Sequence, residues 1–180
     1  EGAATGRFPK VGRGVKRLSE SLGETGYAMH CKGLEFPAYQ PDTNPGYPWA
    51  IAGGHMSMAT YMALALEGNT SLDYWAKLIT ERGLYFVRDD LLGLCKFAGI
   101  TADHVVEGLK HESGFEATPA ELLAAVRRAF IRALWLERKQ GYDRSDYTLP
   151  SEVFDRPNPN LGVPPFVTRE FFSQLSDRVW

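Results

Sequence analysis

The stretch Thr118-Pro119-Ala120-Glu121 begins the longest regular pattern in the sequence, which continues to Gly141. A threonine followed three residues later by a glutamate can satisfy the free N–H groups of a helix start, and proline suits the first helical position. We therefore predict a helix over 119–139. Its apolar face is built from Leu122, Leu123, Val126, Phe130, Ala133, Leu134 and Leu136. Three arginines, at positions 127, 128 and 132, are expected on the opposite, solvated side.

Similar spacing of apolar residues on both sides of this segment predicts further helices near 9–22, 57–67, 71–88, 102–111 and 168–177. Ser71 and Thr168 are suitable capping residues, and Gly83 is expected to break or bend the helix over 71–88. No segment alternates long enough to indicate a sheet. The sequence therefore predicts an all-α fold: one irregular multi-helix domain over residues 1–180.

Prolines interrupt the helical pattern in two places and predict long loops there. The first group is Pro37, Pro41, Pro45 and Pro48, and the second is Pro150, Pro157, Pro159, Pro164 and Pro165. A proline-spaced loop of this length is either functional or a surface connection. The second group predicts an extended tail without regular structure before the last helix.

Charge and composition exclude several classes of protein. The chain has 20 Lys and Arg against 22 Asp and Glu, so it lacks the basic stripe that nucleic-acid binding requires. No apolar run approaches the roughly 18 residues of a membrane helix. The N-terminus has neither an initiator methionine nor the profile of a signal peptide. We therefore expect a cytoplasmic chain, a fragment of a longer protein, with no nucleic-acid or membrane partner.

The chain has two cysteines, Cys31 and Cys95. Two are too few for a disulfide-stapled secreted scaffold, so reduced thiols are expected. They are also too few for a cubane iron–sulfur cluster, which needs four thiolates. Cys95 lies in Asp90-Leu91-Leu92-Gly93-Leu94-Cys95-Lys96, and by spacing alone this stretch indicates a helix end, a glycine turn and a small core cysteine.

The same stretch resembles the D-x-x-G-L-C segment of the aldehyde ferredoxin oxidoreductase family, whose members are tungsten- or molybdenum-pterin enzymes. Two more segments are similar to that family in the same order. His30-Cys31-Lys32-Gly33-Leu34-Glu35-Phe36-Pro37-Ala38-Tyr39 resembles H-x-K-G-L-E-x-P-A-Y. Leu136-Glu137-Arg138-Lys139-Gln140-Gly141-Tyr142, followed by Asp146-x-Thr148-Leu149-Pro150, resembles a late helix and its D-x-T-L-P continuation.

The resemblance implies a metal held by two pterins, one [4Fe-4S] cluster, and oxidation of an aldehyde to a carboxylic acid with electrons passing to ferredoxin. Cys95 matches the family's fourth cluster cysteine, whereas the segment that supplies the other three is not in this chain. Asp90 matches the carboxylate that accepts hydrogen bonds from the pterin. Gly93, Leu94, Cys95 and Lys96 match the backbone beside the cofactor, and Cys31 has no metal role. The resemblance thus implies that the chain is a C-terminal fragment of a larger oxidoreductase, and the isolated chain is expected to be inactive.

A catalytic histidine is harder to assign. The glycine pair of the family's R-G-G-x-H segment is present as Gly53-Gly54, but the arginine is missing. Ser57 occupies the family's histidine position and His55 lies two residues earlier. His55 is therefore either a substitute catalytic residue or a turn histidine.

These departures leave other functions open: a relative that acts on another substrate, such as an aromatic acyl thioester, or a helical interaction domain without cofactor. Expected partners are upstream domains of the same protein, ferredoxin or another electron-transfer protein, and a small aldehyde-like substrate. An oligomer is possible.

Overall fold

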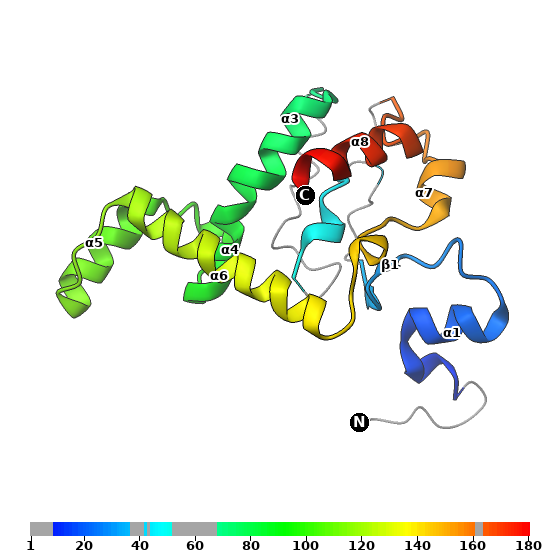
Figure 1. Ribbon diagram of the computed structural model, residues 1–180, viewed down its shortest axis with the longest axis horizontal. Helices are drawn as coiled ribbons and strands as arrows, with labels where there is room; N and C mark the ends of the chain where they lie inside the picture. The colour runs from blue at the N-terminus through cyan, green and yellow to red at the C-terminus, as the bar shows by residue number, and fades with distance from the viewer. Residues whose placement is uncertain (1–8, 37–41, 43, 52–67, 161–163) are drawn as a thin grey trace.

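The computed structural model describes residues 9–36, 42, 44–51, 68–160 and 164–180. Helices dominate these residues (Figure 1), and the sheet among them is a two-stranded antiparallel pair, β1 (His30–Cys31) and β2 (Leu34–Glu35). The all-α prediction is therefore confirmed. The helix predicted over 57–67 lies outside the described residues, as does the segment Gly53-Gly54-His55.

Four predicted helices are present: two of them begin at the predicted caps Thr118 and Thr168, whereas the helix predicted over 9–22 becomes α-helical only at Gly14. A short 3-10 turn, η1 (Val11–Arg13), leads into α1 (Gly14–Leu22), and the others are α5 (Ala102–Ser113), α6 (Pro119–Lys139) and α8 (Arg169–Val179). At the start of α6, the Glu121 N–H donates to Thr118 Oγ1 at 3.2 Å and the Thr118 N–H donates to Glu121 Oε2 at 2.8 Å. Because these bonds join residues only three apart, the sequence alone locates this helix start.

The predicted helix over 71–88 is longer and less regular than expected. It consists of α3 (Leu72–Lys77), a π-helical turn η4 (Leu78–Arg82) and α4 (Gly83–Leu92). Ser71 caps it as predicted. The chain stays helical through Gly83, but the α-helix is interrupted directly before this residue by the π-helical turn. The helix also ends four residues later than predicted, so Asp90 lies in the last turn of α4.

Several short elements were not predicted. The hairpin β1–β2 turns at Lys32 and Gly33, which have φ angles of 53° and 90°. Helix α7 (Ser151–Asp155) interrupts the segment that was expected to be extended. The structure also has 3-10 turns η3 (Tyr47–Trp49), η5 (Lys96–Ala98) and η6 (Arg144–Asp146). Elements of two to five residues give too little periodicity for a pattern to reveal them.

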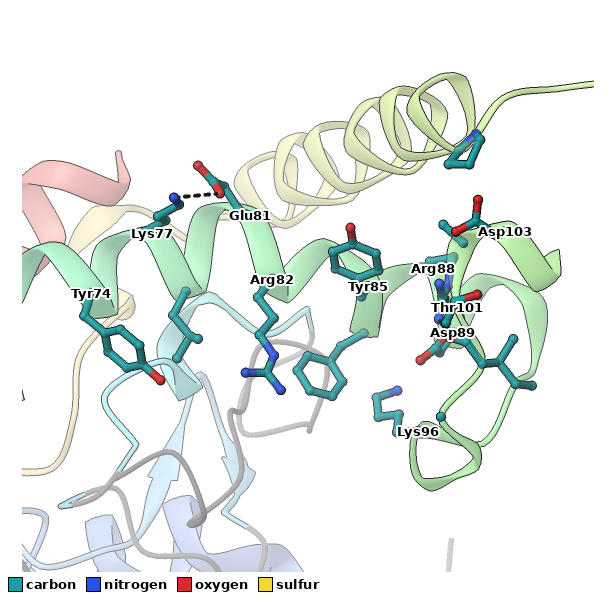
Figure 2. Close-up of a pocket in the computed structure, with 16 residues that line it drawn as sticks. Tyr74, Lys77, Glu81, Arg82, Tyr85, Arg88, Asp89, Lys96, Thr101 and Asp103 are labelled. Atoms are coloured by element: carbon teal, nitrogen blue, oxygen red, sulfur yellow. Dashed lines mark hydrogen bonds and ion pairs between the residues drawn. The ribbon is translucent and has the colours of Figure 1, made fainter. Parts of the chain in front are cut away.

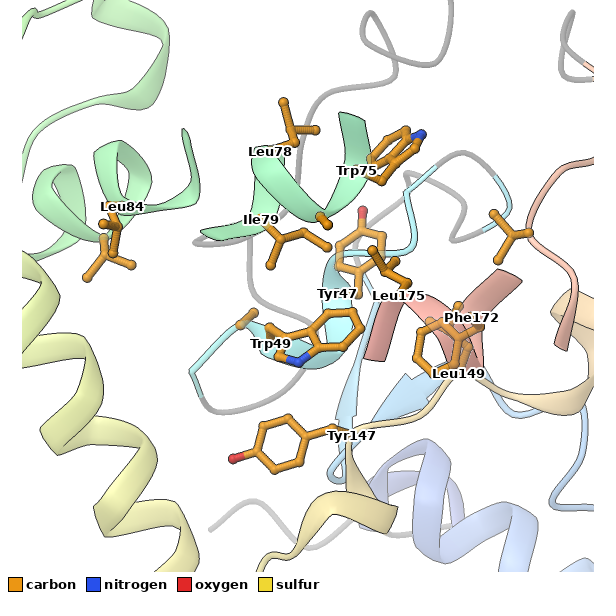
Figure 3. Packing of buried hydrophobic residues seen from close by; sticks show 14 of the residues in the cluster. Tyr47, Trp49, Trp75, Leu78, Ile79, Leu84, Tyr147, Leu149, Phe172 and Leu175 are labelled. Carbon is orange, nitrogen blue, oxygen red and sulfur yellow. The ribbon is translucent and has the colours of Figure 1, made fainter. Parts of the chain in front are cut away.

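One apolar cluster joins segments from most of the chain (Figure 3). Trp75 of α3, Ile79 of η4 and Leu175 of α8 are completely buried. The Trp49 ring lies 5.6 Å from that of Phe172. Residues 44–50 of the first proline-rich loop are all buried, so this part of the loop is core and not a surface connection.

The arm formed by α5 and the first half of α6 extends away from this core (Figure 1). Helix α5 packs on α6, and α6 also packs on α4. Helix α8 packs on α3, where Arg178 forms an ion pair with Asp73. The end of α4 therefore lies between the core and the arm.

Candidate cofactor-binding turn at the end of helix α4

Helix α4 ends in a tight turn centred on Gly93. The Gly93 N–H donates to the Asp90 carbonyl at 3.3 Å, and the Leu94 N–H donates to the Asp89 carbonyl at 2.8 Å. This pair of bonds is a Schellman motif, which requires a residue with positive φ after the helix. Gly93 has φ 67°, and a side chain there would meet no atom within 4 Å. Glycine is therefore needed for its backbone conformation and not for space.

The turn places Asp90 and Lys96 side by side. The Lys96 ammonium forms an ion pair with Asp90 Oδ1. The side chain of Lys96 is only 9% exposed, whereas that of Asp90 is 34% exposed, so part of the carboxylate faces solvent. The sequence resemblance assigned Lys96 only through its backbone. The structure adds a role for its side chain, which orients the Asp90 carboxylate.

Cys95 is an exposed free cysteine. Its backbone is extended, with φ −72° and ψ 123°, and its carbonyl accepts the Ala98 N–H at 3.0 Å as η5 begins. The alternative that Cys95 is a small core residue is therefore wrong. The thiol is held between two defined elements, α4 and η5, and can be reached from outside the chain.

A buried arginine, which the sequence did not single out, holds the returning loop. Arg88 is 2% exposed, and its Nε donates to Asp89 Oδ1 at 2.8 Å. Its Nη2 donates to the carbonyl of Ile100 at 2.6 Å. The guanidinium thus ties the last two turns of α4 to the end of the loop over 93–100. A buried ion pair between neighbouring residues leaves no periodic signal in a sequence, so this residue could not be found from the pattern.

A cavity of about 770 Å³ lies beside the turn. Among the residues that line it are Tyr74, Arg82, Tyr85, Arg88, Lys96 and Asp103. Tyr74 and Arg82 extend from one side of the continuous helix formed by α3, η4 and α4, and Lys77 and Glu81 extend from the other side (Figure 2). The cavity is therefore lined by aromatic rings and by charged groups of both signs.

The two other segments of the family resemblance meet in a second, buried cluster, Lys32–Glu137–Tyr147. Lys32 Nζ lies 2.9 Å from Glu137 Oε2 and donates to the Ala50 carbonyl at 2.9 Å. The Tyr147 O–H donates to the same Glu137 oxygen at 2.6 Å, and its ring centroid lies 4.0 Å from Lys32 Nζ. The side chains of Lys32 and Glu137 are 1% and 7% exposed. Because every charge in this cluster is compensated, the burial is tolerated.

Cys31 lies beside this cluster and is buried. Its Sγ is 3.4 Å from the Asp146 carbonyl. Burial raises the pKa of the Cys31 thiol from 9.0 to about 11. The thiolate is the form that binds metals, so a thiol held neutral at physiological pH is a poor ligand. Burial and the adjacent Glu137 carboxylate also raise the pKa of Tyr147.

Within the described residues, no group of three or more His, Cys, Asp and Glu side chains could hold a metal ion by itself. No helix among them is long and apolar enough to cross a membrane. Of the site residues indicated by the sequence, the structure brings together Asp90, Gly93, Leu94, Cys95 and Lys96.

These features define a helical domain that carries an exposed thiol next to a carboxylate–ammonium pair. A family model described as aldehyde ferredoxin oxidoreductase, domains 2 & 3, matches residues 4–174. The chain therefore belongs to the aldehyde ferredoxin oxidoreductase family, a family of oxidoreductases. No curated protein matches the sequence.

Proposed function

We propose that this chain is the C-terminal helical domain of a tungsten- or molybdenum-pterin, iron–sulfur oxidoreductase. In this proposal Cys95 is one ligand of a [4Fe-4S] cluster, and Asp90 accepts hydrogen bonds from a pterin ring. The other cluster ligands come from an upstream part of the same protein. The substrate is a small aldehyde, and the electrons pass to ferredoxin.

The observation that carries the proposal is the difference between the two cysteines. Cys95 is exposed on a tight turn next to Asp90, whereas Cys31 is buried and its pKa is raised. Only the first thiol is available to a cluster whose other ligands lie outside this chain. The donor set therefore fits an iron–sulfur ligand at Cys95.

The chain's own residues would bind and orient the cofactors. An ionised carboxylate is a pure acceptor, which suits the amino and ring N–H donors of a pterin. Lys96 pairs with Asp90 and orients its carboxylate, and Arg88 holds the loop that follows Cys95. When bound, the metal–pterin group and cluster would supply the two-electron oxidation of an aldehyde and water to a carboxylic acid and protons.

A cysteine comparison in the intact protein tests the proposal. Cys95→Ala should damage the cluster, and Cys31→Ala is the matched control, since it removes the other thiol from a buried position. Electron paramagnetic resonance of the cluster and turnover of an aldehyde should be measured in both variants. A normal cluster signal and full activity in Cys95→Ala would show that the assignment is wrong. Loss of the cluster in Cys31→Ala alone would show that the wrong cysteine was chosen.

Asp90→Asn gives a second test, of the pterin contact. The amide has the size of the carboxylate but replaces a charged acceptor with a mixed donor and acceptor. Pterin content should fall while the cluster signal stays. If the intact protein contains an iron–sulfur cluster but reduces an aromatic acyl thioester and does not oxidise an aldehyde, the proposed substrate is wrong and the cofactor assignment stands. Absence of both cofactors would favour a helical interaction domain.

A further inference from the structure

One guanidinium nitrogen of Arg88 is buried without a hydrogen-bond partner. The other two nitrogens are used: Nε donates to Asp89 Oδ1 at 2.8 Å and Nη2 donates to the Ile100 carbonyl at 2.6 Å. Nη1 has no partner among the residues that the structure describes, although Arg88 is only 2% exposed. A buried donor without an acceptor is costly, and a charged one more so. Nη1 therefore needs an acceptor that these residues do not supply.

The start of helix α5 lies next to this nitrogen. Ile100, whose carbonyl accepts Nη2, comes two residues before Ala102, where α5 begins. Arg88, Thr101, Ala102 and Asp103 all line the cavity of about 770 Å³, and Figure 2 shows Arg88 and Thr101 at the same end of it. The N–H groups in the first turn of a helix have no intrahelical acceptor and carry partial positive charge. Two kinds of hydrogen-bond donor therefore meet at this end of the cavity.

The cavity also offers apolar surface for the body of a ligand. The centroid of the Tyr85 ring lies 5.4 Å from Arg88 Cζ, and Phe86, Ile100 and Ala102 are further lining residues. Small-molecule pockets typically enclose about 300–1,000 Å³ and combine apolar walls with a few polar groups that fix orientation. The size and the lining of this cavity therefore suit a small molecule with a flat, apolar body.

The carboxylates that already line the cavity do not satisfy Nη1. Glu81 Oε2 lies 3.9 Å from Lys77 Nζ, and Asp89 is bound by the other nitrogens of Arg88. Asp103 is exposed in the first turn of α5. None of the three accepts a hydrogen bond from Nη1. An acid from outside the chain could supply the acceptor, and Asp103 is the carboxylate that would oppose it.

We propose that this end of the cavity binds the carboxylate of a small aromatic acid, with the ring of the acid beside Tyr85. Arg88 Nη1 donates to one carboxylate oxygen, and the start of α5 supplies N–H groups and partial positive charge. An ionised acceptor suits both, because hydrogen bonds to charged groups are the stronger ones. A flat ring packs favourably against a tyrosine ring. The inference does not depend on the proposed cofactors.

Calorimetric titration of the 180-residue chain with sodium benzoate tests the site. Benzoate should bind with a Kd of about 1 mM or tighter. Benzamide has the same ring and nearly the same shape but no charge, so it should bind at least about tenfold more weakly. Nitrogen-15 NMR should show shifts of the Arg88 side-chain signal and of the Ala102 and Asp103 amides. Equal binding of benzamide, or shifts only elsewhere in the chain, would overturn the proposal.

Asp103→Asn gives a test in the opposite direction. Removing the opposing charge should tighten benzoate binding by about two- to fivefold and leave benzamide unchanged. Glu170→Gln is the matched control, because it removes an exposed carboxylate from the first turn of α8, away from the cavity. It should leave benzoate binding as it is. An unchanged affinity in Asp103→Asn would show that no anion binds at the start of α5.

Two further variants should abolish binding. Arg88→Lys removes Nη1, and Ala102→Leu fills this end of the cavity without touching Arg88; each should weaken benzoate binding by at least about tenfold. Ala120→Leu is the control for the second, since it makes the same change at an exposed position in the first turn of α6. Circular dichroism verifies that the variants fold, and Ala102→Leu decides if Arg88→Lys does not. If Nη1 binds only an ordered water, benzoate will not bind at about 20 mM and the proposal is wrong.

Discussion

The Lys32–Glu137–Tyr147 cluster and the Asp90–Lys96 turn each contain a lysine–carboxylate pair next to a cysteine, but they differ in exposure. In the first, the Lys32 and Glu137 side chains are 1% and 7% exposed and the neighbouring Cys31 thiol is buried. In the second, the Asp90 carboxylate is 34% exposed and Cys95 is free at the surface. The comparison shows that similar side chains have different roles depending on burial: the buried cluster is structural, whereas the exposed turn is accessible to other molecules.

The contacts around each lysine–carboxylate pair explain this difference in role. Lys32 contacts a carbonyl, a carboxylate and an aromatic ring contributed by segments far apart in the sequence. Lys96 and Asp90 are six residues apart and belong to one turn. The first cluster therefore stabilises the tertiary fold, whereas the second fixes only local geometry.

The largest expected difference between the two regions is in the free energy of unfolding that is lost when each lysine is replaced by methionine. Lys32→Met leaves the Glu137 carboxylate buried without its countercharge, which should cost about 3–5 kcal/mol of unfolding free energy. Lys96→Met leaves a partly solvated carboxylate and should cost about 1 kcal/mol or less. Urea denaturation of both variants measures the two losses. Equal losses would contradict the division between the two regions.

The second-largest expected difference is between the alkylation rates of the two thiols. A pKa raised from 9.0 to about 11 leaves Cys31 with about one hundredth of its ordinary thiolate at neutral pH, and burial slows access further. Cys95 should therefore react with iodoacetamide at least about a hundredfold faster in the folded chain. Mass spectrometry of timed samples follows both sites. In urea the rates should become similar, and a folded chain with similar rates would disprove the assigned burial.

A smaller effect is expected from removing one phenolic O–H. Tyr147→Phe deletes the bond to the buried Glu137 carboxylate and should cost about 1.5–3 kcal/mol, the range for hydrogen bonds to charged groups. Tyr85→Phe is the matched control, since Tyr85 is 40% exposed, and should change stability by less than about 0.5 kcal/mol. Thermal unfolding of both variants compares them. A cost at Tyr85 as large as at Tyr147 would argue against the special role of the buried cluster.

The smallest effect concerns the glycine that forms the exposed turn. Gly93→Ala puts a side chain at φ 67° and should destabilise the chain by about 1 kcal/mol, although the added carbon meets open space. Gly108→Ala, within α5, also meets open space but without positive φ, and should stabilise by about 0.5–1 kcal/mol. Opposite signs in denaturant melts would show that the turn needs glycine for its backbone. The same sign for both would refute this.

Much of the fold follows from signals within a few residues of one another. The start of α6 at Thr118 and Glu121, the cap at Thr168 and the glycine turn at Gly93 were all located from the sequence, because each bond joins near neighbours. The apolar face of α6 was less well predicted: Leu136 was assigned to it but is 54% exposed. Helical spacing indicates which residues share a face, but not how wide a face the neighbouring elements cover.

The features of the candidate site also fall into those that the sequence predicted and those that only the structure revealed. The sequence alone determined most of the longer helices, the turn at Asp90–Lys96 and the resemblance that singles out Cys95, although it missed α7. Only the tertiary structure decided which cysteine is exposed, that Arg88 holds the returning loop, and that Lys32 pairs with Glu137 over a separation of 105 residues. The reason is physical: caps and turns are made by bonds between near neighbours, whereas burial and the pairing of distant charges depend on how whole segments pack.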